Sequence, residues 1–145
     1  MPSEETNATA DDEPSERFLT LIGVGAGLVQ FVAFTAVGVL ALENVVYSGI
    51  IGLFAGVGSF LFIPWFVGLS AVQEAADGDV SLSAATERVS RSTQRGLIGF
   101  GLEAGAIVMI AVAFALDGAD FLVGVPAALA VALAIYFVGS VVIGR

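Results

Sequence analysis

The sequence predicts an all-α integral membrane protein, a four-helix bundle made of two helical hairpins. The 145 residues are 57% hydrophobic and only 13% charged, whereas soluble domains carry about 25% charged residues. The hydrophobic residues are gathered into four runs, and each is long enough to cross a bilayer, which takes roughly 20 residues as a helix. The expected spans cover about 18–42, 46–72, 97–116 and 121–144.

Polar segments separate these runs. Residues 1–16 contain no large apolar side chain apart from the initial methionine, which predicts a disordered acidic cytoplasmic tail. The short polar segments 42–44 and 117–120 each predict a tight antiparallel hairpin. The longer polar segment 73–96 is expected to form a cytoplasmic loop between the hairpins, so that 17–145 make up one membrane domain.

All basic residues are arginines, at positions 17, 88, 91, 95 and 145. With four spans, these positions share one side of the membrane with both chain ends. Cytoplasmic segments are enriched in Lys and Arg, so both termini are predicted to be cytoplasmic and the protein to be a multi-pass protein of the cell membrane. Arg88, Arg91 and Arg95 would share one helix face, and they are candidate contacts for anionic lipid headgroups. The alternative is that they only set the topology.

The chain has no Cys, no His and no Lys, and its 14 acidic residues give a net charge of -9. This composition resembles the proteins of salt-loving archaea, in which carboxylates keep the surface hydrated. In composition and span pattern the chain resembles small multi-span membrane proteins of haloarchaea, which have no assigned function. Small multidrug-resistance exporters also have four spans and a membrane glutamate. Theirs lies in the first span, where this chain has Gly25, so that family is not assigned.

Glu103 is the only ionisable residue well inside an expected span. A charge at the centre of a membrane helix costs ~2.5–3.5 kcal/mol, so this carboxyl should face protein or water, or be protonated. Gln30 lies near the middle of the first span, where its amide can bond across helices. Glu103 and Gln30 form the candidate ion or proton site. The alternative for Glu103 is a neutral or hydrogen-bonded carboxyl that fixes helix packing.

Two glycine pairs at GxxxG spacing are predicted to lie at helix contacts, because small residues let membrane helices approach closely. They are Gly23 with Gly27 and Gly101 with Gly105. Glu103 falls roughly opposite the second pair on a helix, so it should not share the glycine face.

The first and third spans share a pattern at a constant shift of 78 positions. Arg17, Leu19, Gly23, Ala26 and Gly27 recur as Arg95, Leu97, Gly101, Ala104 and Gly105. This match predicts a parallel tandem repeat of two hairpins, related by a two-fold axis along the membrane normal. The alternative is chance agreement in a sequence rich in Gly, Ala and Val. Tyr47 and Trp65, ~27 Å apart along the second span, are predicted to mark the two membrane interfaces.

Without His or Cys, the chain lacks imidazole ligands, thiolate catalysis and the usual general base. No enzyme activity, metal site, cofactor or nucleic-acid partner is expected. The favoured function is that of a structural or accessory membrane protein, which packs in the lipid bilayer as a homo-oligomer or with an unknown membrane protein partner. The alternative is a small ion- or proton-coupled carrier or channel subunit that uses Glu103.

Overall fold

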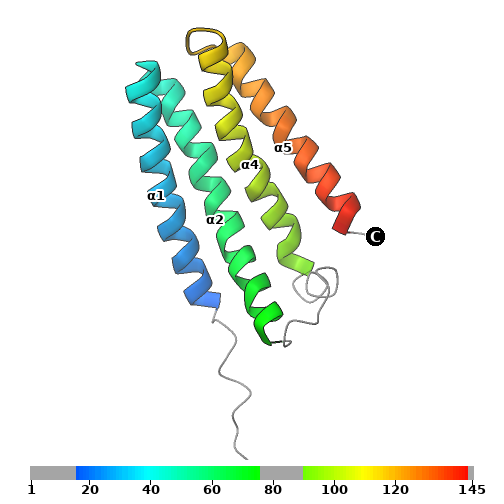
Figure 1. The fold of residues 1–145 in the computed structure, drawn as a ribbon. Helices are drawn as coiled ribbons and strands as arrows, with labels where there is room; N and C mark the ends of the chain where they lie inside the picture. Colours follow the sequence, from blue (N-terminus) through cyan, green and yellow to red (C-terminus); the bar gives the residue numbers. More distant parts are fainter. Residues whose placement is uncertain (1–15, 76–89, 144–145) are drawn as a thin grey trace, which may run out of the picture.

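The computed structural model describes residues 16–75 and 90–143, with side chains at 16–71 and 93–142. These residues form four α-helices, which confirms the predicted all-α class and the four-helix membrane bundle. The helices are α1 (Glu16–Leu42), α2 (Val45–Ala75), α4 (Ser90–Ala115) and α5 (Phe121–Ile143) (Figure 1). Each is long and apolar enough to cross a membrane.

The helices extend into the predicted loop 73–96, within which the sequence already predicts that Arg88, Arg91 and Arg95 lie on a helix. Helix α2 continues to Ala75 and α4 begins at Ser90, so both ends of the predicted loop 73–96 are helical. The parts of the helices suited to span a membrane are Glu16–Leu42, Val45–Ala71, Thr93–Ala115 and Phe121–Val142. The predicted tail lies outside the described residues except for its last position.

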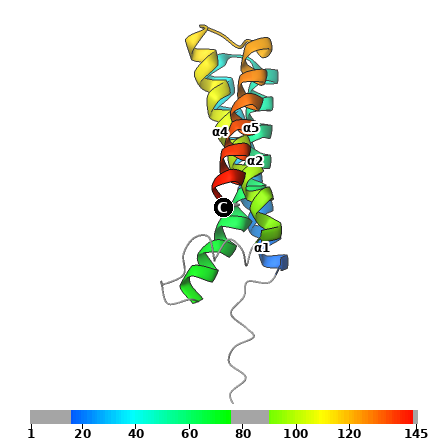
Figure 2. The ribbon, with the colours of Figure 1, turned by 90° about the vertical axis from the view of Figure 1, so that its right-hand side faces the viewer.

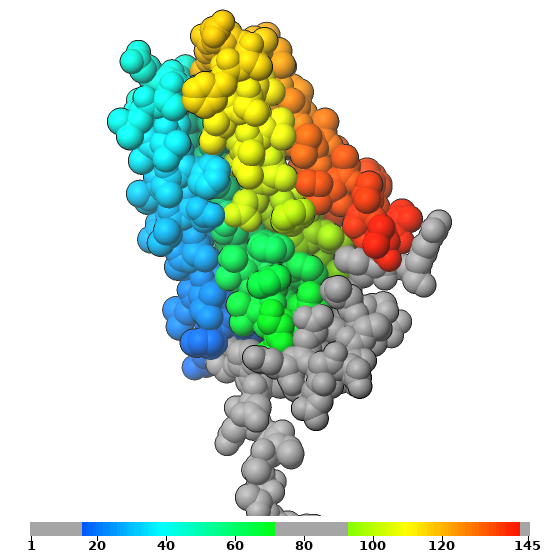
Figure 3. Space-filling view, in the orientation of Figure 1, coloured from blue at the N-terminus to red at the C-terminus, as the bar shows by residue number. Residues whose placement is uncertain are grey.

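The four helices stand side by side in chain order, in a single layer. Figure 1 has α1 and α5 at the two edges with α2 and α4 between them, and Figure 2 shows the narrow side of the layer. The space-filling view has α4 in the middle of one face, with α1 and α5 on either side (Figure 3). Extensive contacts join α1 to α2, α2 to α4 and α4 to α5. The bundle is therefore open, and its two edge helices each pack extensively against one neighbour.

The two ends of this layer differ in charge. Arg17 and Arg95 lie at the end where α1 and α4 begin, and we call it the arginine end. The opposite end carries the two hairpin turns, and we call it the turn end. Its ionisable residues are acidic: Glu43, Asp117 and Asp120.

Both turns use the same backbone conformation. Glu43 and Asp117 adopt the left-handed region, with φ of 53° and 54°, and a residue in this region ends a helix by turning the chain away. The next helix then starts at a side-chain cap. Asn44 Oδ1 accepts a hydrogen bond from the backbone N–H three residues on, at 2.9 Å, and Asp120 Oδ1 accepts two from the first turn of α5. Each hairpin is tight because the residue that ends one helix lies within three positions of the residue that caps the next.

The four glycines of the predicted GxxxG pairs are buried where the two helices of a hairpin meet. They are Gly23, Gly27, Gly101 and Gly105. A Cβ atom on Gly27 would lie 2.7 Å from the carbonyl oxygen of Gly56, and one on Gly105 would lie 3.0 Å from that of Ala128. The backbones of paired helices therefore touch directly, with no side chain between them.

The two hairpins also pack in the same register. Matching positions differ by 78 in the first helix of each hairpin and by 72 in the second. The matching contacts are Gly27 with Gly56 and Gly105 with Ala128, then, one turn away, Gly23 with Phe60 and Gly101 with Ala132. This common register supports the tandem repeat.

The predicted two-fold axis between the hairpins is wrong. A two-fold rotation that exchanges α1 with α4 and α2 with α5 would pack α5 against α1 just as α2 packs against α4. In the structure α1 and α5 lie at opposite edges of the layer (Figure 1). The second hairpin is instead displaced sideways along the layer from the first.

Tyr47, one of the two residues predicted to mark the membrane interfaces, faces the protein interior and not the lipid. Its side chain is 0% exposed, and its hydroxyl donates a hydrogen bond to the carbonyl oxygen of Met109 in α4, at 3.0 Å. The ring fills the space beside Gly124 of α5, where any side chain would exclude it. Trp65 lies half-buried over Gly96 of α4, and its Nε1 atom is buried with no hydrogen-bond partner among the described residues.

Candidate functional site

Three polar side chains, one each from α1, α2 and α4, meet in the middle of the layer. Glu103 Oε1 accepts a hydrogen bond from Gln30 Nε2 at 3.1 Å and another from Ser59 Oγ at 3.0 Å. Glu103 and Gln30, the two candidates for an ion or proton site, are therefore in direct contact, and Ser59 joins them. We call these three residues the Glu103 cluster.

The Glu103 cluster lies close to the midpoint of each span. Glu103 is ten residues, or ~15 Å of helix, from the start of its span at Thr93, and twelve residues from its end. Gln30 and Ser59 each lie fourteen residues from the start of their spans and twelve from the end. Counted from Leu97, Glu103 lies ~9 Å into the span. The longer count starts at Thr93 and includes the polar residues Gln94 and Arg95. The carboxyl thus lies well inside the span, where a charge is costly.

Two glycines bring α2 and α4 together beside the cluster. A Cβ atom on Gly58 would lie 2.8 Å from Gly99 O and from Glu103 N, and one on Gly99 would lie 2.6 Å from Gly58 O. The two backbones are therefore in contact. This contact places the short side chain of Ser59, which is 1% exposed, within hydrogen-bond reach of the facing carboxyl.

The cluster offers hydrogen-bond donors to the carboxyl. Gln30 donates through its amide nitrogen and Ser59 through its hydroxyl, and both bond to the same oxygen. That oxygen can accept both bonds whether the carboxyl is ionised or neutral. Among the described residues, no group of three His, Cys, Asp or Glu side chains could hold a metal ion. The arrangement therefore satisfies one carboxyl in an apolar layer by joining three helices.

The three arginines proposed as headgroup contacts are not equally well placed. Arg95 is exposed at the arginine end of α4, and it has no ion pair among the described residues. Arg91 belongs to α4, but its side chain lies outside the description, and Arg88 lies wholly outside it. Arg95 is therefore the one of the three whose surroundings can be stated.

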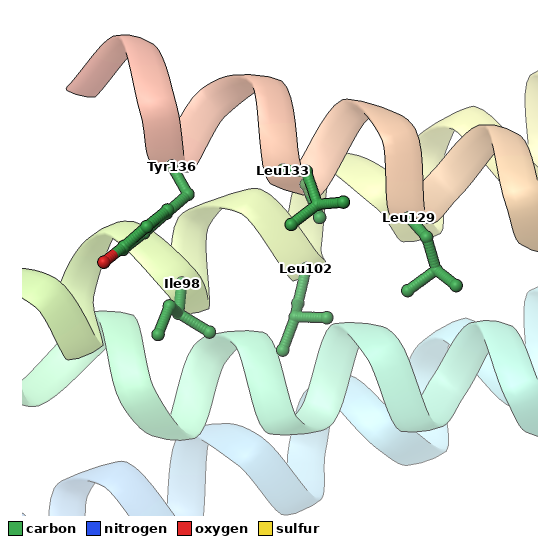
Figure 4. A pocket seen from close by; sticks show the side chains of 6 residues that line it. Ile98, Leu102, Leu129, Leu133 and Tyr136 are labelled. Atoms are coloured by element: carbon green, nitrogen blue, oxygen red, sulfur yellow. The ribbon is translucent and has the colours of Figure 1, made fainter. Parts of the chain in front are cut away.

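A groove of about 330 Å³ runs between α4 and α5 (Figure 4). It is lined by Ile98, Leu102, Leu129, Ala132, Leu133 and Tyr136. In Figure 4 the two leucines of α5 and Leu102 of α4 lie along it, and Tyr136 lies near Ile98 at one end. Apart from the Tyr136 hydroxyl, these side chains are apolar. We call this feature the α4–α5 groove.

Comparison with known proteins does not identify a family for this chain. No protein-family model, curated protein or solved structure matches the chain. Its function must therefore be argued from the contacts themselves.

The sequence patterns did not point to Ser59, to its neighbour Gly58 or to Gly99. Serine and glycine are typical of membrane helix contacts, so a signal was present. It did not stand out, because the chain holds 18 glycines and because a serine in a helix can bond its own backbone, as Ser70 does with Phe66 O at 3.0 Å. No pattern in the sequence predicted the α4–α5 groove.

Proposed function

We propose that the protein is a structural or accessory membrane protein that packs with itself or with another membrane protein. One observation carries this proposal: both hydrogen bonds to Glu103 cross between helices, beside a direct contact of the α2 and α4 backbones. Polar side chains bonded across membrane helices hold them together. The open layer supports the second half of the proposal, because its two edge helices leave long faces free for other membrane components.

A small ion- or proton-coupled carrier or channel subunit is the alternative. The observation that favours it is the depth of Glu103, because ionisable side chains at mid-membrane often mark proton or ion pathways. The second carboxyl oxygen, Oε2, makes no hydrogen bond among the described residues. Against this alternative, Gln30 and Ser59 already bond to Oε1 as donors, as they would in a packing contact.

We expect the protein to conduct no protons, Na⁺ or K⁺ when it is reconstituted into vesicles. Glu103→Gln should be at least as stable as the parent, because the amide oxygen can accept both bonds that Oε1 accepts. The measurements are fluorescence assays of internal pH, Na⁺ and K⁺ under imposed gradients, together with unfolding of both proteins by SDS titration.

Flux by the parent that Glu103→Gln abolishes would establish the alternative and overturn the packing role. Glu103→Asp then serves as a matched test, because it retains titration but shortens the side chain. In a carrier it would shift the pH dependence of flux. In a packing site it would only weaken the two hydrogen bonds and lower the stability.

We further propose that the arginine end faces the cytoplasm. Arg17 and Arg95 lie in the first turns of α1 and α4 at this end, and the turn end carries Glu43, Asp117 and Asp120. Basic residues favour the cytoplasmic side. In this orientation both termini are cytoplasmic and the two short turns face outward.

Single cysteines should test this orientation cleanly, because the parent has none. Gly118→Cys lies in a turn at the turn end, and Glu16→Cys begins α1 at the arginine end. A membrane-impermeant thiol reagent is expected to label Gly118→Cys on intact cells and Glu16→Cys only after permeabilisation. The reverse pattern would invert the topology, and labelling of both on intact cells would contradict the three spans that separate them.

A further inference from the structure

The α4–α5 groove lies on the same helix face as Arg95. Ile98 and Leu102 line the groove from α4, and Arg95 precedes them by three and seven residues, which places all three along one face of the helix. Arg95 is therefore one turn beyond the end of the groove, toward the arginine end. The groove is therefore apolar along its length, and a positively charged side chain lies just beyond one end.

Tyr136 of α5 adds a second polar group near the same end of the groove. It lines the same end of the groove from α5, where Figure 4 shows its ring beside Ile98. A tyrosine whose ring lies on apolar side chains and whose hydroxyl lies at the polar end suits the level of lipid headgroups. Along α5, the groove continues from Tyr136 to Leu129, ~10 Å toward the middle of the span.

The first hairpin provides an internal comparison. A groove also runs between α1 and α2, with a volume of about 320 Å³, but it is lined by Phe60 where the second hairpin has Ala132. It continues from there toward the turn end, past Leu28 and Phe31. The second groove, which has Ala132 at this position, extends toward the arginine end as far as Ile98 and Tyr136.

The arginines of the two hairpins also differ. Arg17, the counterpart of Arg95 in the repeat, directly follows an acidic residue, Glu16. Arg95 stands between Gln94 and Gly96. Arg95 therefore has no carboxylate next to it in the chain, whereas Arg17 does.

We propose that the α4–α5 groove binds an anionic phospholipid, with one acyl chain along the groove and the phosphate at Arg95. The apolar lining matches a hydrocarbon chain, and guanidinium groups bind phosphate through several donors in a planar array. The volume of the groove falls in the range of ~300–1,000 Å³ that is usual for ligand sites. The bilayer supplies this ligand directly, since α4 and α5 both span it.

Native mass spectrometry of the full chain in detergent tests the proposal with added phosphatidylglycerol or phosphatidylcholine. Phosphatidylglycerol should be retained roughly fivefold better, as expected for one arginine at a charged membrane surface. Arg95→Gln is expected to bring this preference close to one. Arg17→Gln is the matched control, because it removes the corresponding arginine of the other hairpin, and it should leave the preference unchanged.

The groove itself is tested by Ala132→Phe, which gives the second hairpin the residue that the first has at Phe60. It should lower retention of both lipids while leaving the helical content unchanged. Leu102→Trp fills the groove from α4, and it replaces Ala132→Phe if that variant fails to fold. The proposal is overturned if Arg95→Gln keeps the parent's preference, or if a folded groove-filling variant retains lipid as the parent does.

Discussion

Replacing Gly99 by valine is expected to separate the two hairpins and to lower the free energy of unfolding by about 3 kcal/mol or more, the upper end of what overpacking costs. Even a Cβ atom at this position would lie 2.6 Å from Gly58 O and 2.6 Å from Phe62 N. Both are backbone atoms, so rotation of a side chain cannot relieve the clash. Helix α4 would have to move away from α2, and the hydrogen bond from Ser59 to Glu103 would break with it.

Unfolding by SDS titration measures the loss, and Trp65 reports the separation. It is the only tryptophan, and it packs over Gly96, three residues from the substituted position. Brominated lipids should quench its fluorescence more strongly in Gly99→Val than in the parent. The matched controls are Gly25→Ala and Gly68→Ala, where a Cβ atom meets nothing within 4 Å, and these should be neutral or slightly stabilising. A Gly99→Val variant as stable as the controls would show that α2 and α4 are not in direct contact.

The spans, and the need of Glu103 for hydrogen-bond partners, could be predicted from the sequence because the bilayer imposes both. A helix must be apolar over the whole hydrocarbon thickness, so the four apolar runs predicted the spans and the short polar segments predicted the turns. A carboxyl inside such a run must find partners. Gln30, the amide near the middle of the first span, was a natural candidate, and the structure brings the two into contact.

The order of the helices could not be predicted, because lipid-facing and helix-facing side chains are equally apolar in a membrane. Leu122 is 88% exposed and Ile51 is 0% exposed, yet both are aliphatic residues within spans. A repeat in sequence fixes how each hairpin packs internally. It does not fix which faces join the hairpins, and here Gly58 and Gly99 decide this, through a contact that has no counterpart in the sequence pattern.

The second large effect is expected when Glu103 loses both hydrogen-bond donors. In the double variant Gln30→Met and Ser59→Ala, the carboxyl remains at mid-span with no partner. The free energy of unfolding should fall by ~2–3 kcal/mol, close to the cost of an unsupported charged side chain at this depth. The loss should exceed the sum for two ordinary interhelical hydrogen bonds, which average ~0.6 kcal/mol each, because a buried group left without partners is costlier than a bond that was never made.

Adding Glu103→Met to that double variant should restore most of the stability, since methionine is unbranched, is similar in length and needs no hydrogen bond. SDS titration of the parent, the double variant and the triple variant measures this recovery. If the two donors mattered only through their own packing, the triple variant would be as unstable as the double variant. Recovery would instead show that the three helices are arranged around the need to satisfy one carboxyl, which is the physical basis of the packing role proposed for Glu103.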